Sequence, residues 1–256
     1  IRNDLPTCCE LLVRGVGMLK TGGDVLQLAS AQHQLGAAQA AMGDITSAVN
    51  TLEGAIVSYS ERLGEKSQQV ASVEAVLGQL NMQMGQRSEG MERLQKAVRI
   101  LEGSLGKSDV ETCFARVALA GALMSEQRSL EAKIQLDIAF PSLKGVLGVA
   151  NQQTVQCLAM MSQLDAQAAR FGEARERINE VLEELKADTT VDLNDPMFGI
   201  LLWQLAEVTL AEGDKNGAKP HFKSAIEIAE SHLGSGHEDV RQMKNRVSGV
   251  WGTADL

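Results

Sequence analysis

Residues 33–56 read HQLGAAQAAMGDITSAVNTLEGAI, and the fold can be predicted from the pattern of this stretch. Small residues stand at Gly36, Ala48 and Ala55, and a turn signal, Gly43-Asp44, lies between the first and the second of them. Two antiparallel helices approach closely only where small side chains meet, and glycine commonly ends a helix. The stretch therefore predicts a helical hairpin in which the small residues mark the helix crossings.

The same arrangement returns with a period of about 42 residues, and the dipeptide Leu-Gly marks it. Its copies are Leu63-Gly64, Leu105-Gly106, Leu147-Gly148 and Leu233-Gly234. The first three copies are 42 residues apart, whereas the last interval is 86. We infer one further repeat with a two-residue insertion in the polar stretch 187–196. A fixed period of this length is the sequence signature of a solenoid.

Stacking the chain in this register aligns three sites of small residues, all Gly, Ala or Ser except Val181. The sites are Gly36, Gly78, Ala120, Ser162 and Ala206; Ala48, Gly90, Ala132, Ala174 and Ala218; and Ala55, Ala97, Ala139, Val181 and Ala225. Further turn signals, Gly85-Gln86 and Gly213-Asp214, separate the first two sites. The hairpin of residues 33–56 is thus one of about five.

Composition agrees with an all-helical chain. The 256 residues include four prolines and only 3% aromatic residues, and 44% are hydrophobic, which suffices for a buried core. The net charge of −9 argues against nucleic acid as a partner, because binding to phosphates needs clustered cations. The longest apolar run, around residues 197–210, is interrupted by Gln204 and Glu207, so we expect no membrane span.

The order of Leu before a small residue, Gly at the turn, then Ala, a large apolar residue and Ala resembles the tetratricopeptide repeat (TPR). The best copies are Gln34-Leu35-Gly36 with Gly43-Asp44, Ala48, Leu52 and Ala55, and Gln204-Leu205-Ala206 with Gly213-Asp214, Ala218, Phe222 and Ala225. The resemblance implies an all-α, right-handed superhelical solenoid of about five TPR-like helix pairs, with a leading half-repeat and a C-terminal capping helix.

Two departures from the family stand out. The period is 42 residues instead of the family's usual 34. The sites where the family often has Tyr carry Gln39, Asn81, Leu123, Asp165 and Thr209. The longer period and the segment 233–240 are similar to the long repeats of the kinesin light chain class.

We expect a single solenoid over residues 1–256. Its parts are a partial leading repeat (5–26), five repeats (28–69, 70–111, 112–153, 154–196 and 197–236) and a capping helix (237–256). The capping helix carries an apolar stripe at Val240, Met243, Val247 and Trp251. Terminal elements of this kind cover the open ends of a solenoid.

The resemblance also implies that the first helix of each repeat lines a concave groove. The positions expected to face it are His33, Ala37 and Ala40; Ala75, Gln79 and Met82; Val117, Gly121 and Met124; Ala159, Gln163 and Ala166; and Trp203, Glu207 and Leu210. Family members that hold an acidic carboxylate use Lys, Arg and Asn here, so this neutral groove disfavours such ligands. Trp203 is expected to be either a binding anchor or a plug for the fifth repeat. The alternative for the Met and Ala positions is that they belong to the core of the repeats and do not line the groove.

Signatures of catalysis and of metal binding are missing from the sequence. No glycine-rich phosphate loop follows a strand, and no nucleophile has an evident base. His232 and His237 lie near Glu230, Glu238 and Asp239, but their spacing of five does not place both on one helical face. We therefore expect no enzyme, no cofactor and no metal.

Cys8, Cys9, Cys113 and Cys157 form no CxxC pair, so we interpret them as reduced, mostly buried residues. This favours an intracellular reducing compartment, either the cytoplasm or an organelle interior. The sequence begins at Ile1 and not at Met, so a targeting segment is not visible.

The predicted function is a non-catalytic scaffold or adaptor that holds a segment of another protein in the groove. One alternative is a structural or assembly-factor subunit of a larger complex, which would use the convex face or the edges. A second alternative is the regulatory repeat region of a longer enzyme. The oligomeric state is left open.

Overall fold

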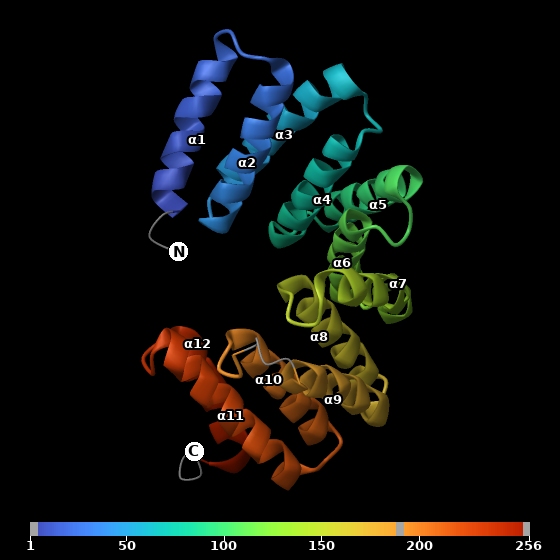
Figure 1. The fold of residues 1–256 in the computed structure, drawn as a ribbon, viewed down its shortest axis with the longest axis vertical. Coiled ribbons are helices and arrows are strands. Elements are labelled where there is room, and N and C mark those ends of the chain that lie inside the picture. The colour runs from blue at the N-terminus through green and yellow to red at the C-terminus, as the bar shows by residue number, and fades with distance from the viewer. Residues whose placement is uncertain (1–4, 188–191, 253–256) are drawn as a thin grey trace. The chain divides into compact units, whose positions relative to one another are not determined.

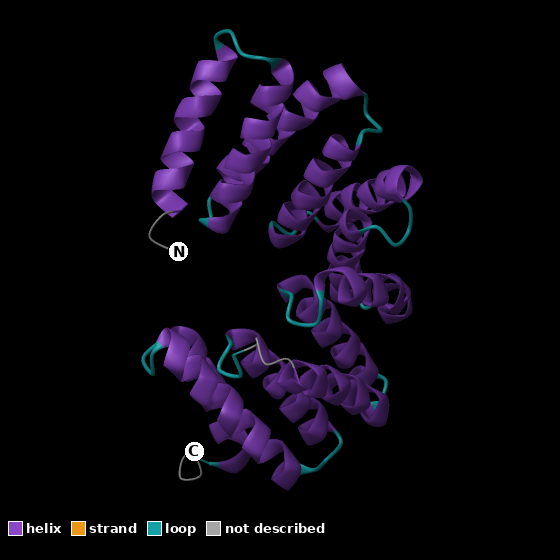
Figure 2. Ribbon diagram, viewed as in Figure 1, coloured by secondary structure: helices purple, strands orange, loops and turns teal. Residues whose placement is uncertain are grey.

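The computed structural model describes residues 5–187 and 192–252, and its regular elements are all α-helices (Figure 2). The chain divides into two compact units, residues 1–139 and 140–256, and the division lies within α7. The helices up to this division are α1 (Leu5–Lys20), α2 (Val25–Ala41), α3 (Ile45–Leu63), α4 (Gln68–Gln83), α5 (Arg87–Leu105), α6 (Val110–Ser125) and α7 (Ser129–Leu147), as Figure 1 labels them. The later helices are α8 (Gln152–Gln167), α9 (Phe171–Ala187), α10 (Pro196–Ala211), α11 (Lys215–Leu233) and α12 (Glu238–Trp251). The two-residue insertion expected within 187–196 falls partly on residues 188–191, outside the described part.

Unit 1 is built from helical hairpins in which small residues meet large ones. A Cβ atom placed on Gly36 of α2 would lie 2.5 Å from Cγ of Leu52 on α3. In the next hairpin, a Cβ on Gly78 of α4 would lie 2.7 Å from Cγ of Leu94 on α5, and one on Gly90 would lie 2.8 Å from the carbonyl oxygen of Gly78. Real Cβ atoms do not pack this closely. Glycine therefore sets the distance between the helices.

The turns between paired helices share one geometry. The second residue after the end of the first helix has a positive φ, at Gly43 (84°), Gly85 (78°), Gln127 (59°), Ala169 (57°) and Gly213 (101°). The next amide donates to a carbonyl five residues back, for example Gln86 N to Asn81 O at 2.8 Å and Arg170 N to Asp165 O at 2.8 Å. This is the Schellman end of a helix. Glycine was the predicted turn signal, so the sequence revealed only the three glycine copies.

The remaining helix ends repeat in the same way. The first helix of each pair begins after a residue whose side-chain oxygen accepts a backbone amide: Asp24, Ser67, Asp109, Asn151 and Asp195. Caps of this type contribute about 1 kcal/mol each. The Leu-Gly dipeptides lie at the other end, where Gly64, Gly106, Gly148 and Gly234 take a positive φ after the second helix. The spacing of 42 therefore measures from one second-helix end to the next.

Unit 2 packs α8, α9, α10, α11 and α12 around an apolar core. Ile178 of α9, Leu201 of α10 and Phe222 of α11 are almost completely buried. The Phe222 ring makes edge contacts with Trp203 (centroids 4.7 Å apart) and with Trp251 of α12 (5.8 Å). The expected stripe of α12 joins this core through Val247, with Met243 and Trp251 packed against it, and Val240 is also buried. Among the described helices, none is long and apolar enough to cross a membrane.

Candidate functional site

The first helices of unit 1, α2, α4 and α6, pack side by side, since α4 contacts both α2 and α6. Most of the predicted groove positions on these helices are open to solvent at least in part. We call these positions the unit 1 face: His33, Ala37, Ala40, Ala75, Gln79, Met82, Gly121 and Met124. Gln79 and Ala37 are exposed, and the other six are half-buried. Apart from His33, the unit 1 face carries no ionisable side chain.

Val117 does not belong to this surface. The sequence analysis placed it in the groove, but its side chain is only 3% exposed. It lies on α6 among buried neighbours such as Arg116 and Leu119. The position of Val117 in the helical repeat did not reveal its burial, because α6 is buried over a larger part of its circumference than α2. Val117 therefore contributes to packing and not to a binding surface.

A polar cluster borders the unit 1 face and joins its three helices. The Ser72 hydroxyl on α4 donates a hydrogen bond to the Glu111 carboxylate on α6. Burial lowers the pKa of the His33 imidazole on α2, and the negative charge of Glu111 acts in the opposite direction. Burial therefore dominates, and a lowered pKa favours the neutral imidazole at neutral pH. His33 can then both donate and accept a hydrogen bond.

In unit 2 the predicted positions have unequal surroundings. Gln163 of α8 is exposed and Ala159 and Ala166 are half-buried. Glu207 of α10 forms an ion pair of 3.0 Å with Arg246 of α12, so its charge is compensated within the chain. Leu210 packs beside the core that contains Phe222. Only Gln163 therefore presents a side chain that is both exposed and uncharged.

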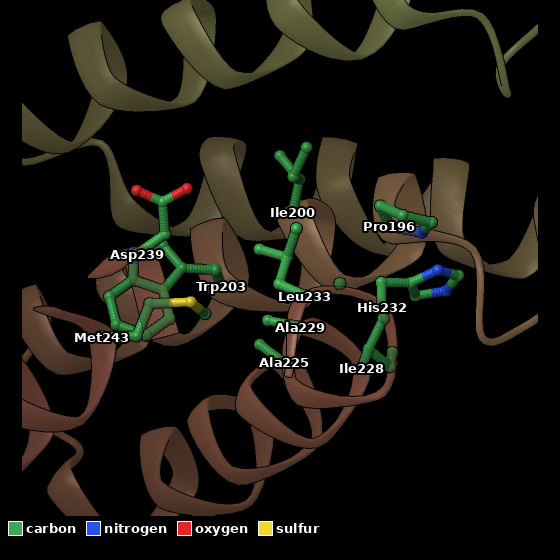
Figure 3. Close-up of a pocket in the computed structure, with 11 residues that line it drawn as sticks. Pro196, Ile200, Trp203, Ala225, Ile228, Ala229, His232, Leu233, Asp239 and Met243 are labelled. Atoms are coloured by element: carbon green, nitrogen blue, oxygen red, sulfur yellow. The ribbon is translucent and has the colours of Figure 1, made fainter. Parts of the chain in front are cut away.

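Trp203 has two kinds of neighbour. Its indole makes a T-shaped contact with the Phe222 ring in the core, and Met243 of α12 lies close by (Figure 3). Trp203 also lines an open apolar pocket of about 370 Å³ that is formed by α10, α11 and the start of α12. The predicted roles of anchor and of plug are thus not exclusive in this geometry.

The pocket is the part of the site that the sequence analysis missed. Its walls are largely apolar, with Ile200, Ile228 and Leu233 among the lining side chains (Figure 3). Its polar groups are His232 at one end and Asp239 at the other. The sequence contains a signal for the pocket at Ala229, because the corresponding position of the earlier repeats carries Tyr or Leu.

The histidines considered for a metal have structural contacts. His232 Nε2 lies in hydrogen-bond contact with the carbonyl oxygen of Asn194, and His237 Nδ1 accepts the amide of Asp239 at 3.3 Å as the cap of α12. The described residues include no group of three or more His, Cys, Asp or Glu arranged to hold a metal. The expectation for the cysteines is correct for Cys113 and Cys157, which are buried, and wrong for Cys8, which is exposed on α1.

Comparison with known proteins identifies the fold. No family model matches the chain, and no curated protein matches it. The chain is similar to the solved structure of BtubC (BKLC) from P. vanneervenii, with a TM-score of 0.72 at 15% identity over 91% of this chain and 93% of that one. It is also similar to a putative kinesin light chain with nearly identical TPR-like repeats from Podosopora anserina, with a TM-score of 0.69 at 18% identity over 82% and 98%.

A third similar structure contains a ligand. It is the Rap conjugation gene regulator of the plasmid pLS20 in complex with the Phr peptide, with a TM-score of 0.58 at 14% identity over 88% of this chain and 64% of that one. The described helices and these likenesses confirm the predicted all-α, TPR-like repeat fold and its resemblance to kinesin light chain repeats.

Proposed function

We propose that this chain is a non-catalytic interaction scaffold that holds a segment of a partner protein against its first helices. The observation that carries the proposal is the unit 1 face, which extends over α2, α4 and α6 and is almost free of charge. A surface without ionic side chains that is open to solvent across three helices favours a peptide over a charged small molecule. The single solenoid over residues 1–256 remains part of this proposal.

The residues of the unit 1 face suit an extended peptide. The Gln79 amide offers a donor and an acceptor, which is what a peptide backbone requires. Met82 and Met124 offer flexible apolar contacts that adapt to different side chains. The Phr peptide bound by the pLS20 regulator supports this proposal by likeness of fold.

A second candidate function has an observation of its own. Leu130 and Ile134 on α7 are 80% and 56% exposed, and both lie on the second helix of their pair. Large apolar side chains exposed one turn apart are typical of a protein contact. This surface would suit a structural subunit of a larger assembly, which would use its second helices.

The experiment that separates the two is affinity capture of the tagged chain from its native extract, followed by mass spectrometry. The variant Gln79→Lys puts a charge in the middle of the unit 1 face. As a matched control, Asn50→Lys puts the same charge at an exposed position of α3. We expect a captured protein that is lost with Gln79→Lys and kept with Asn50→Lys. Capture of the same proteins by both variants would contradict the proposal and favour the assembly subunit.

A further inference from the structure

The pocket of unit 2 includes a position at which this repeat has a smaller side chain than the earlier repeats. In the repeat register, Ala229 of α11 corresponds to Tyr59, Leu101, Leu143 and Leu185 of the earlier second helices. Those four side chains are almost completely buried, at 6%, 1%, 0% and 1% exposure. Tyr59 belongs to a core that contains Val70 and Val73 of α4, and Leu185 belongs to a core that contains Phe198 and Leu201 of α10. Ala229 has no side chain of this size and lines the pocket of about 370 Å³.

The empty position retains the apolar surroundings of a leucine. Ala225, Ile228 and Leu233 of α11 line it on one side, and Ile200 and Trp203 of α10 line it on the other (Figure 3). Ile200 and Leu233 are 44% and 46% exposed, so the apolar surface extends from the pocket to its rim. A side chain that enters from outside would therefore contact apolar atoms from the rim to the inside of the pocket.

The rim of the pocket has a negative charge at one end. The Asp239 carboxylate belongs to the first turn of α12 and its side chain is 69% exposed. His237 Nδ1 lies 3.5 Å from this carboxylate, and the residues that line the pocket include no Lys or Arg. A cation from outside can therefore approach Asp239 without displacing an arginine or lysine that lines the pocket.

We propose that this pocket binds a partner peptide through one leucine-sized aliphatic side chain, with a Lys or Arg of the same peptide placed against Asp239. The inserted side chain takes the place that Leu101, Leu143 and Leu185 fill from within the chain. Trp203 forms a wall of the pocket and gives the peptide a flat apolar contact. The inference rests on the proposed scaffold function and assigns it a second contact, in unit 2.

The test fills the pocket from within. The variant Ala229→Leu restores the side chain that the register predicts, and Ala211→Leu adds the same side chain at an exposed position near the end of α10 as the control. Random peptides displayed on phage are selected on the wild-type chain. The selected peptides are then labelled and titrated against the three proteins by fluorescence anisotropy.

We expect the selected peptides to share an aliphatic residue near a Lys or Arg. Their affinity should fall about tenfold or more in Ala229→Leu, the loss expected when a buried aliphatic side chain has no space, and should not change in Ala211→Leu. The melting temperature of Ala229→Leu should rise, because the added side chain fills an apolar space. Weaker binding by a more stable protein excludes misfolding as the cause.

The charge is tested separately with Asp239→Asn. This variant should lose the preference for Lys or Arg in the peptide and keep the preference for the aliphatic residue. Equal binding by Ala229→Leu and wild type, or selected peptides without an aliphatic residue, would overturn the proposal. Self-association of the wild-type chain that Ala229→Leu abolishes would also overturn it, since a second copy would then fill the pocket. If Gln79→Lys does not change the captured proteins but the peptide selection succeeds, only the proposal that the unit 1 face binds a partner would be contradicted.

Discussion

The sharpest prediction concerns two glycines of one helix, Gly90 and Gly103 of α5. Both are replaced by Ala, and the two variants should change stability in opposite directions. Gly103 has nothing within 4 Å of the added Cβ, whereas the Cβ at Gly90 would lie 2.8 Å from the carbonyl oxygen of Gly78. A backbone oxygen cannot rotate away as a side chain can, so α4 and α5 must move apart.

The magnitudes follow from two opposing terms. Ala is favoured over Gly inside a helix by about 0.8–1.0 kcal/mol, and overpacking costs about 1–3 kcal/mol. Gly103→Ala, in the last turn of α5, has only the first term and should stabilise by about 0.5 kcal/mol. Gly90→Ala has both terms and should destabilise by up to about 2 kcal/mol. Each kcal/mol corresponds to about 2–4 °C in melting temperature for a chain of this size.

Urea unfolding followed by circular dichroism measures both variants against the wild type, and the slope of the transition shows whether the comparison is valid. Gly90→Ala should unfold at lower urea concentration and Gly103→Ala at higher. An equal or higher midpoint for Gly90→Ala, with the expected gain for Gly103→Ala, would refute the close approach of the two helices. The explanation that a close helix crossing requires a small residue at Gly90 would then be wrong.

Three further outcomes follow from the described contacts. Replacing Gln127 or Ala169 by Gly should stabilise the chain by about 0.5–1 kcal/mol in thermal unfolding, because both residues have a positive φ. Asp165→Asn should destabilise by about 3 kcal/mol in urea unfolding, because this carboxylate is fully buried against two arginines that keep partial contact with water. His33 has a folded-state pKa below its ordinary value of 6.5, so the unfolded chain binds more protons and stability falls as the pH drops through and below that value. His33→Gln should flatten this part of the stability profile.

The sequence was sufficient for the fold because its signals recur. A small residue is required at Gly36 and Gly78 by a close helix crossing, and glycine is favoured in the Leu-Gly dipeptides by a positive φ. Because each repeat has the same requirement at the same place, these residues recur at a fixed spacing. The turns at Gln127 and Ala169 were not found, because both residues adopt the positive φ of this turn without being glycine and so carry no turn signal in the sequence.

The site was less predictable for a different reason. Glu207 was expected to face an open groove, but it pairs with Arg246, and a charge pair across 39 residues leaves no pattern in the sequence. Val117 was misplaced because phase does not report how wide an arc of a helix is buried. The pocket depends on a missing side chain at Ala229, which becomes visible only when the repeat register is extended to the end of each second helix.

The way in which the helices contact each other has a consequence for the speed of folding. Within the described part of each unit, a helix packs only against helices one or two places away in the chain, as α4 does against α2, α3, α5 and α6. Contacts of short sequence separation need little loop closure, and chains dominated by them fold in microseconds to milliseconds. Folding can begin at any well-formed hairpin and spread to its neighbours. The hairpin of α4 and α5, with its glycine crossing and fully buried leucines, is a natural place for folding to begin.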